Sequence, residues 1–128
     1  MKLLLDTHIW IWLTDHPRRL GRKASNMLQN PRHELWLSPI SIVEALTLHS
    51  KGKVLLHGDL MDWVAQSSLG TKSAPFTPEV ALSTRQFPMD MDPADRILAA
   101  TALEFDLTLV TADQRLLDLG NIKTLASR

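Results

Sequence analysis

The stretch that says most about the architecture is Lys2-Leu3-Leu4-Leu5-Asp6-Thr7. Its apolar run is short and predicts a buried strand rather than a helix. Asp6 and Thr7 belong to the residue types that cap helices, so the strand is expected to end where a helix begins. Helical spacing of apolar residues follows over 8–15, which predicts a strand-to-helix unit at this point of the chain.

The same alternation of short strands and helices continues along the sequence. Further strands are predicted at 35–37, 73–76, 107–110 and 122–125. Helices are predicted at 20–28, 39–51, 59–69, 78–86, 92–105 and 113–119. Strands that are separated by helices pair in parallel, because a crossover needs a long connection. The sequence therefore predicts an α/β fold with a central parallel sheet of four to five strands flanked by helices.

Length and composition limit the organisation and chemistry of the chain. With 128 residues and 45% apolar side chains, one globular domain over 1–128 is expected. The absence of cysteine excludes a disulfide scaffold, a thiolate zinc site and a cysteine nucleophile. Lys plus Arg and Asp plus Glu both number 14, so no net charge attracts a polyanion and any nucleic-acid binding must be local.

The sequence also bears on location. No apolar run approaches the roughly 18 residues that span a bilayer, and the first residues lack the pattern of a signal peptide. We therefore expect a cytoplasmic protein that does not bind membranes.

Acidic residues are expected to gather at one edge of the predicted sheet. Asp6 follows the first strand, Asp113 follows the strand at 107–110, and Asp95 lies in the first turn of the preceding helix. In parallel sheets, ligands bind beyond the carboxyl ends of the strands. Glu44 falls on an otherwise apolar helix face, where a carboxylate needs a partner.

Such a cluster has a chemical consequence. Two bare carboxylates about 5 Å apart repel by roughly 3 kcal/mol at an effective dielectric constant of about 20. Protons or a cation must therefore intervene. Oxygen ligands without cysteine or neighbouring histidine favour Mg²⁺ or Mn²⁺, which support phosphodiester hydrolysis.

Most of these acids also have a structural explanation. Asp92 before Pro93 is a good N-cap, and Asp95 stands where a capping-box partner would. Asp113 opens a helix, where the macrodipole favours an acid. Asp6 is a common residue type at a strand end, whereas Glu44 has fewer such explanations.

Four segments carry a family resemblance and occur in a fitting order: Leu3–Trp10, Ser38–Ala45, Asp92–Ala102 and Leu109–Asp113. Together they resemble the PIN domain, the fold of VapC-type toxins in type II toxin-antitoxin systems. The second segment is similar to the family's Ser-x-x-Ser-x-x-Glu motif. The resemblance spans nearly the whole chain and implies a three-layer α/β/α sandwich.

The resemblance also implies an activity, that of a Mg²⁺-dependent endoribonuclease, with Mn²⁺ as a possible ion. Its catalytic residues would be Asp6, Glu44, Asp95 and Asp113. Asp6, Asp95 and Asp113 would hold the metal directly or through water, and Glu44 would position a second metal or the attacking water. Asp92 and Thr111 would orient these ligands. Related sequences often carry histidine just before Asp-Pro, in the place of Asp90.

The implied partners are an RNA substrate, a cognate antitoxin and a second copy of the chain in a homodimer. Basic residues that could contact phosphates are Arg18, Arg19, Arg22, Lys23, Arg96 and Arg115. Arg96 shares a helical turn with Asp92, which favours an ion pair between them.

Aromatic residues divide by their helical positions. Trp10 falls opposite Ile9 and Leu13 and is predicted to be an exposed contact for the antitoxin. Trp12 is expected in the core or a subunit interface, like Trp36 and Trp63. His8 is expected at the polar rim of the site.

Two other readings compete with this one. An aspartyl-phosphate phosphatase would need a second aspartate where His8 stands, and neither it nor a receiver domain finds the lysine it needs at a late strand end. A non-catalytic PIN-fold module that binds protein or RNA is the main alternative. The presence of all four mutually repelling acids argues against this alternative, because a module that only binds does not need them.

Overall fold

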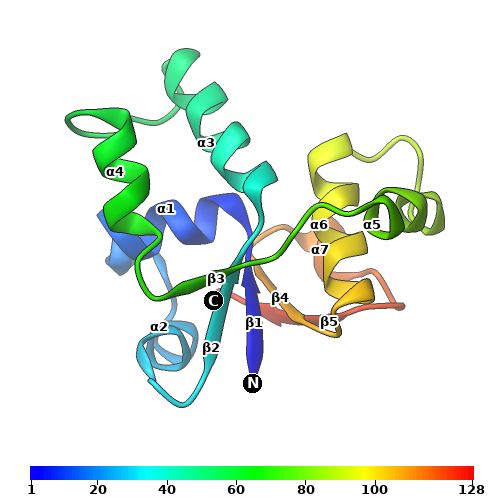
Figure 1. Cartoon of the computed structure of the whole chain (residues 1–128). Coiled ribbons are helices and arrows are strands. Elements are labelled where there is room, and N and C mark those ends of the chain that lie inside the picture. Colours follow the sequence, from blue (N-terminus) through cyan, green and yellow to red (C-terminus); the bar gives the residue numbers. More distant parts are fainter.

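Parallel strands form the centre of the structure, a computed structural model that describes residues 1–128 (Figure 1). The strands are β1 (Lys2–Leu5), β2 (Glu34–Leu37), β3 (Thr71–Ser73), β4 (Thr108–Thr111) and β5 (Lys123–Ala126). They lie in the order β3-β2-β1-β4-β5, and every pairing is parallel. The predicted α/β class with a parallel sheet is confirmed.

Helices connect the strands. They are α1 (Thr7–Asp15), α2 (Arg22–Gln29), α3 (Pro39–Ser50), α4 (Leu60–Ser67), α5 (Pro78–Ser83), α6 (Pro93–Glu104) and α7 (Gln114–Leu117), with 3₁₀ turns η1 (Pro17–Arg19) and η2 (Thr84–Gln86). None of them is long and apolar enough to cross a membrane.

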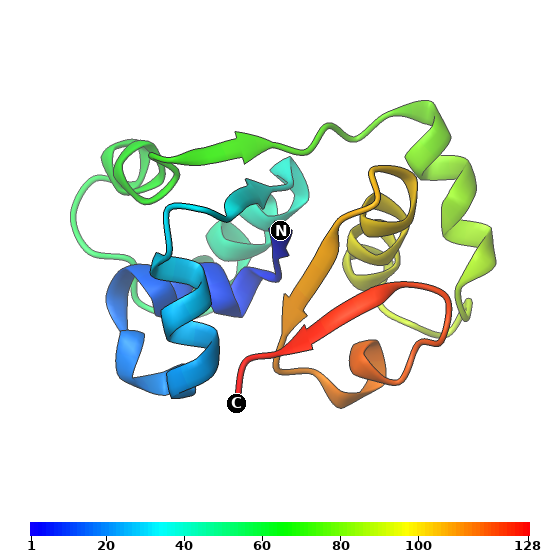
Figure 2. The same cartoon turned by 90° about the horizontal axis from the view of Figure 1, so that it is seen from below.

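The helices cover both faces of the sheet, so the molecule has three layers. Figures 1 and 2 show α1 to α4 on one side and α5 to α7 on the other. Leu3 and Leu5 pack into the cluster on the α1 side, whereas Leu4 packs with α6 residues on the opposite side. This alternation follows from the strand, whose successive side chains point to opposite faces. A central strand covered on both faces needs the continuous apolar run of β1.

Two predicted boundaries are wrong. The strand expected at 73–76 lies at Thr71–Ser73, because pairing with β2 ends where Ala74 donates its N–H to Leu37 and Pro75 has no N–H to continue it. The helix expected from residue 20 begins at Arg22 instead. Pro17–Arg19 forms a separate 3₁₀ turn before it.

Candidate active site

A pocket of about 330 Å³ contains all four acids that the sequence singles out. Its lining residues are Asp6, His8, Trp12, Glu44, Asp92, Asp95, Ala112 and Asp113. The chain visits β2 and β3 on one side of β1 and β4 and β5 on the other, so a topological switch point lies between β1 and β4. Ligands of open α/β sheets bind at such a point, beyond the carboxyl ends of the strands.

Asp6 is the most firmly held of the four acids. It is buried, and one carboxylate oxygen accepts a hydrogen bond from the Thr7 N–H at 2.7 Å as the N-cap of α1. The other oxygen accepts from the Thr111 hydroxyl at 2.6 Å. The Asp6 N–H also donates to the Val110 carbonyl, which ties the end of β1 to β4. The Asp6 side chain therefore has a fixed orientation.

Asp92, Asp95 and Asp113 reach the pocket from helix N-termini. Asp92 caps α6 through the Ala94 N–H at 2.9 Å, and Asp95 lies in the first turn of the same helix. Asp113 caps α7 through the Arg115 N–H at 2.9 Å. The structural explanations of Asp92 and Asp113 therefore hold, yet both side chains also line the pocket.

Glu44 comes from α3, near the middle of the helix. Ser38 caps that helix through the Ile40 N–H and so fixes where its turns begin. The half-buried Glu44 side chain lines the pocket with Asp6 and Asp95. None of the ion pairs in the structure involves Glu44, Asp6, Asp95 or Asp113.

Crowding of these acids changes their protonation. The pKa of Asp95 is raised to about 7, first by burial and then by the negative charges of Asp6, Glu44, Asp113 and Asp92. Burial also raises the pKa of Asp6, although the hydrogen bonds from Thr111 and Thr7 oppose this shift. Negative charge is therefore concentrated in the pocket, and no ion pair neutralises any of the four acids.

The donor set fits a divalent cation of the hard, oxygen-binding type. The lining carboxylates supply hard oxygen donors, and a bound cation would relieve the repulsion among them. In their present rotamers no three acidic or histidine side chains of the chain are arranged to hold one ion. Side-chain rotation or bridging water would complete the coordination, as is usual for Mg²⁺.

The basic residues near the pocket behave differently from expectation. Arg96 forms no ion pair with Asp92; its Nε donates to the Met91 carbonyl at 3.3 Å, so it braces the segment before α6. Arg115 pairs with Asp90 at 2.7 Å. Asp90 thus ties the segment before α6 to α7.

The aromatic residues also differ from expectation. Trp10 is buried, not exposed, because α4 covers that side of α1: its Nε1 donates to the Ser67 carbonyl at 2.9 Å, and its ring meets Trp63 edge-on. Trp12 is instead the tryptophan at the pocket, beside the exposed His8. The spacing of His8 and Trp12 at i and i+4 places both on one side of α1, a sequence signal that could have put Trp12 at the pocket beside Asp6.

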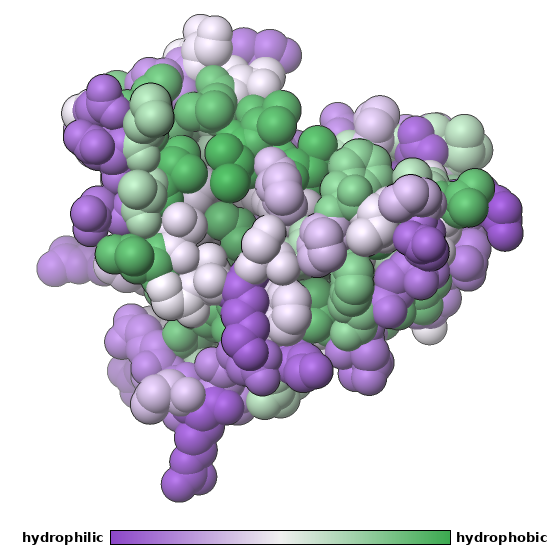
Figure 3. Space-filling model, viewed as in Figure 1, coloured by the Kyte–Doolittle hydropathy of each residue, from purple (hydrophilic) through white to green (hydrophobic).

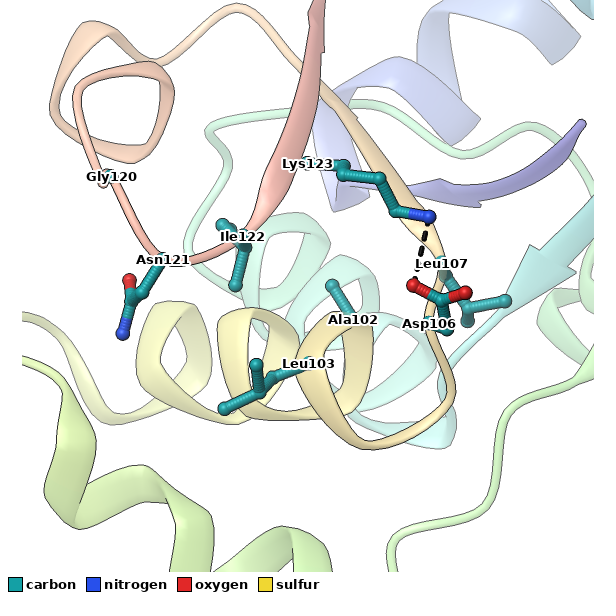
Figure 4. Close-up of a pocket in the computed structure, with 8 residues that line it drawn as sticks. All are labelled: Ala102, Leu103, Asp106, Leu107, Gly120, Asn121, Ile122 and Lys123. Carbon is teal, nitrogen blue, oxygen red and sulfur yellow. Dashed lines mark ion pairs between the residues drawn. The ribbon is translucent and has the colours of Figure 1, made fainter.

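A second pocket, of about 310 Å³, lies away from the acids (Figure 4). It is formed between the end of α6 and the segment leading into β5, and Figure 4 shows Lys123 paired with Asp106 at its edge. Its one carboxylate is neutralised by this ion pair. This pocket lacks the concentration of unpaired charge that distinguishes the first.

The fold and the acidic pocket define a protein class. The chain belongs to the PIN domain family, whose model matches residues 3–122. It is 34% identical over 116 residues to Ribonuclease VapC22 of Mycobacterium tuberculosis (strain ATCC 25618 / H37Rv), a match that covers 89% of this chain and 88% of the relative.

Solved structures show the same fold. The VapBC2 structure from Rickettsia felis, bound to a DNA fragment from its promoter, matches with a TM-score of 0.75 at 14% identity and covers 100% of both chains. The DNA-bound VapBC structure from Salmonella typhimurium matches with a TM-score of 0.73 at 18% identity, covering 100% of this chain and 99% of the other.

Proposed function

We propose that residues 1–128 act as a single PIN domain and hydrolyse phosphodiester bonds of RNA as the toxin of a type II toxin-antitoxin pair. The observation that carries this proposal is the convergence of Asp6, Glu44, Asp95 and Asp113 in one pocket, none of them held in an ion pair. The similarity to a ribonuclease of the VapC type supports the substrate class.

We assign metal binding to Asp6, Asp95 and Asp113, with Mg²⁺ as the ion and Mn²⁺ as a substitute. When bound, the cation neutralises the phosphate and lowers the pKa of a water molecule. Thr111 and the Thr7 N–H hold Asp6 in one orientation, which reduces the motion that this ligand loses on binding. Glu44 enters from α3 and would orient the attacking water.

Hydrolysis then follows the ordinary balance of the reaction. The water oxygen forms a bond to phosphorus and gives one proton to a carboxylate of the pocket. The bond from phosphorus to one ribose oxygen breaks, its electron pair stays on that oxygen, and the oxygen takes up a proton from solvent to leave as a hydroxyl group. Asp92 supports this arrangement by fixing the start of α6, from which Asp95 projects.

We place the enzyme in the cytoplasm. The function is tested by incubating a total RNA pool with the purified protein and looking for cleavage. We expect discrete fragments with Mg²⁺ and none with EDTA. Glu44→Gln, a variant purified in the same way, controls for contaminating nucleases and should give no fragments. Fragments of equal yield in EDTA or from Glu44→Gln would contradict the proposal.

The antitoxin partner has a suitable surface on the other side of α3. An apolar groove of about 420 Å³ lies between α3 and α4 and is lined by Ile42, Leu46, Leu60, Met61, Val64 and Ala65. Apolar side chains gather over these two helices in Figure 3. Contiguous exposed apolar surface marks interaction sites. Once the antitoxin is isolated, Met61→Asp should weaken its inhibition of the ribonuclease while leaving cleavage by the free toxin intact.

We also propose a homodimer. Exposed apolar side chains that support it lie on the segment around α5: Phe76, Leu82 and Met89. Analytical ultracentrifugation should give the mass of two chains for the wild type and a smaller mass for Leu82→Asp. A wild-type monomer at all concentrations would contradict the dimer.

A further inference from the structure

Trp12 lies at the wall of the acidic pocket, outside the set of carboxylates. It is half-buried on α1 and lines the pocket together with Asp6 and Asp95. Trp10 and Trp63 donate their indole N–H groups to protein acceptors, and the indole N–H of Trp36 is buried without one. The Trp12 indole N–H has no protein acceptor and is not among the buried unpaired groups, so it reaches solvent.

Two side chains flank this indole: the polar imidazole of His8 and the cationic guanidinium of Arg19. The exposed His8 precedes Trp12 by one turn, with the ring centroids 6.0 Å apart and the planes at 56°. The Arg19 guanidinium lies over the Trp12 ring, 4.6 Å from its centroid. Arg19 forms no ion pair with any carboxylate, so its hydrogen-bond donors remain free for a ligand.

The segment that carries Arg19 is anchored. The Arg19 carbonyl accepts a hydrogen bond from the Arg128 Nε at 3.2 Å. The Gly21 N–H donates at 2.6 Å to the carbonyl of Ser127, the residue after β5. The cation is therefore placed beside Trp12 by the fold rather than by a free loop.

This arrangement has the chemistry of a single-stranded nucleic-acid subsite. Bases of single-stranded RNA stack on aromatic rings and on arginine planes, and arginine also binds phosphate. The carboxylates beside Trp12 are the proposed place of the scissile phosphate. An apolar protein segment would find a better match in the groove between α3 and α4, because the Trp12 surface combines one ring with cationic and polar neighbours.

We propose that Trp12, flanked by His8 and Arg19, is a nucleobase-binding site that holds a nucleotide next to the scissile phosphate. The base contacts the Trp12 ring, and Arg19 contacts the RNA backbone. This proposal rests on the ribonuclease function and deepens it, since it places part of the substrate recognition at a residue outside the carboxylate set.

The first test uses substrate modification. A short RNA that contains the mapped cleavage site is synthesised with an abasic nucleotide at each position beside the scissile bond. One abasic position should raise the KM of the wild type by about 10- to 100-fold, the range expected for loss of one stacked base. Trp12→Ala should raise KM similarly on the intact RNA, and the same abasic position should then have no further effect.

Matched variants separate stacking from general damage. Trp12→Phe should keep most of the affinity because it keeps a ring. Trp36→Phe is the control, since Trp36 is also half-buried with a cation, Lys72, 5.6 Å from its ring centroid, but does not line the pocket. Arg19→Ala should raise KM, whereas Arg85→Ala, a change at an exposed arginine on the other 3₁₀ turn, η2, should change it little.

A second test does not depend on activity. In EDTA, the single-stranded oligonucleotide should quench part of the tryptophan fluorescence of the wild type and of Trp36→Phe, but not that of Trp12→Phe. Quenching that persists in Trp12→Phe would overturn the proposal. So would independent effects on KM, in which the abasic position raises the KM of Trp12→Ala by the same factor as that of the wild type. So would a Trp12→Ala variant that cleaves RNA normally but resists the antitoxin, since the surface would then bind protein.

If the wild type cleaves no RNA, the ribonuclease function fails, and the quenching experiment alone decides whether Trp12 binds bases.

Discussion

The Thr111 hydroxyl donates a hydrogen bond of 2.6 Å to Asp6, although the two residues are 105 positions apart in the chain. The same hydroxyl oxygen accepts the Asp113 N–H at 3.0 Å. Thr111, the last residue of β4, thus connects the acid that follows β1 to the acid that caps α7. One buried side chain sets the positions of two proposed metal ligands.

Thr111→Val tests this role, because valine keeps the shape and removes the hydroxyl. We expect cleavage to fall by about 10- to 100-fold, the effect typical of groups that orient metal ligands. Stability should fall by about 1–3 kcal/mol, since the buried Asp6 carboxylate loses a donor. Thr111→Ser keeps the hydroxyl, so it should keep most of the cleavage activity and most of the stability of the wild type. Thr108→Val, on the same strand, is the control, and equal losses in the two valine variants would assign Thr111 to packing alone.

Metal binding should be visible in the melting temperature. A ligand that binds only the folded state stabilises it, by about 1.4 kcal/mol at a tenfold excess over Kd. We expect Mg²⁺ or Mn²⁺ to raise the melting temperature of the wild type and of Asp62→Asn, a substitution in the exposed first turn of α4. The rise should be smaller for Asp95→Asn. An equal rise in the melting temperature of Asp95→Asn would show that Asp95 is not a metal ligand.

The metal-free protein should lose stability as the pH rises. The pKa of Asp95 is about 7 in the folded state against 3.8 ordinarily, so between these values the folded chain keeps a proton that the unfolded chain releases. Stability contributed by this proton is present below about pH 4 and is lost progressively up to about pH 7. In EDTA, the melting temperature of the wild type should therefore fall relative to that of Asp95→Asn as the pH rises from 5 to 8. A constant difference between the two proteins would mean that the pKa of Asp95 is not raised in the folded state.

The buried position of Trp10 predicts a stability effect. Trp10→Phe removes the hydrogen bond to the Ser67 carbonyl and part of the contact with Trp63, so we expect a loss of about 1–3 kcal/mol in urea unfolding. Trp12→Phe should lose less, because its indole N–H has no protein acceptor. A larger loss for Trp12→Phe would reverse the assignment of the two residues.

The sequence predicted most of the fold because its strands and helices carry local signals. The apolar run of β1, the N-caps Asp6 and Ser38 and the proline at the start of α6 each mark a boundary that the structure confirms. The acids could be placed at one edge because parallel strands share their carboxyl ends.

The remaining features depend on tertiary packing. The side of α1 that carries Trp10 is covered by α4, and no local pattern shows where a distant helix will lie. Arg96 could reach either a carboxylate or a carbonyl, and the path of the 87–92 segment decided between them. The Trp12 and Arg19 contact joins two segments across a turn, which periodicity alone does not place.

The central claim is that the four acids act as one catalytic centre on RNA. The most direct measurement is the kcat/KM of Asp6→Asn on the mapped RNA with Mg²⁺, beside the wild type and Asp62→Asn, with circular dichroism of all three. We predict a loss of roughly 10³-fold or more for Asp6→Asn with an unchanged fold, on the scale of other essential catalytic groups, and no loss for Asp62→Asn. Wild-type kcat/KM in a folded Asp6→Asn protein would contradict the account.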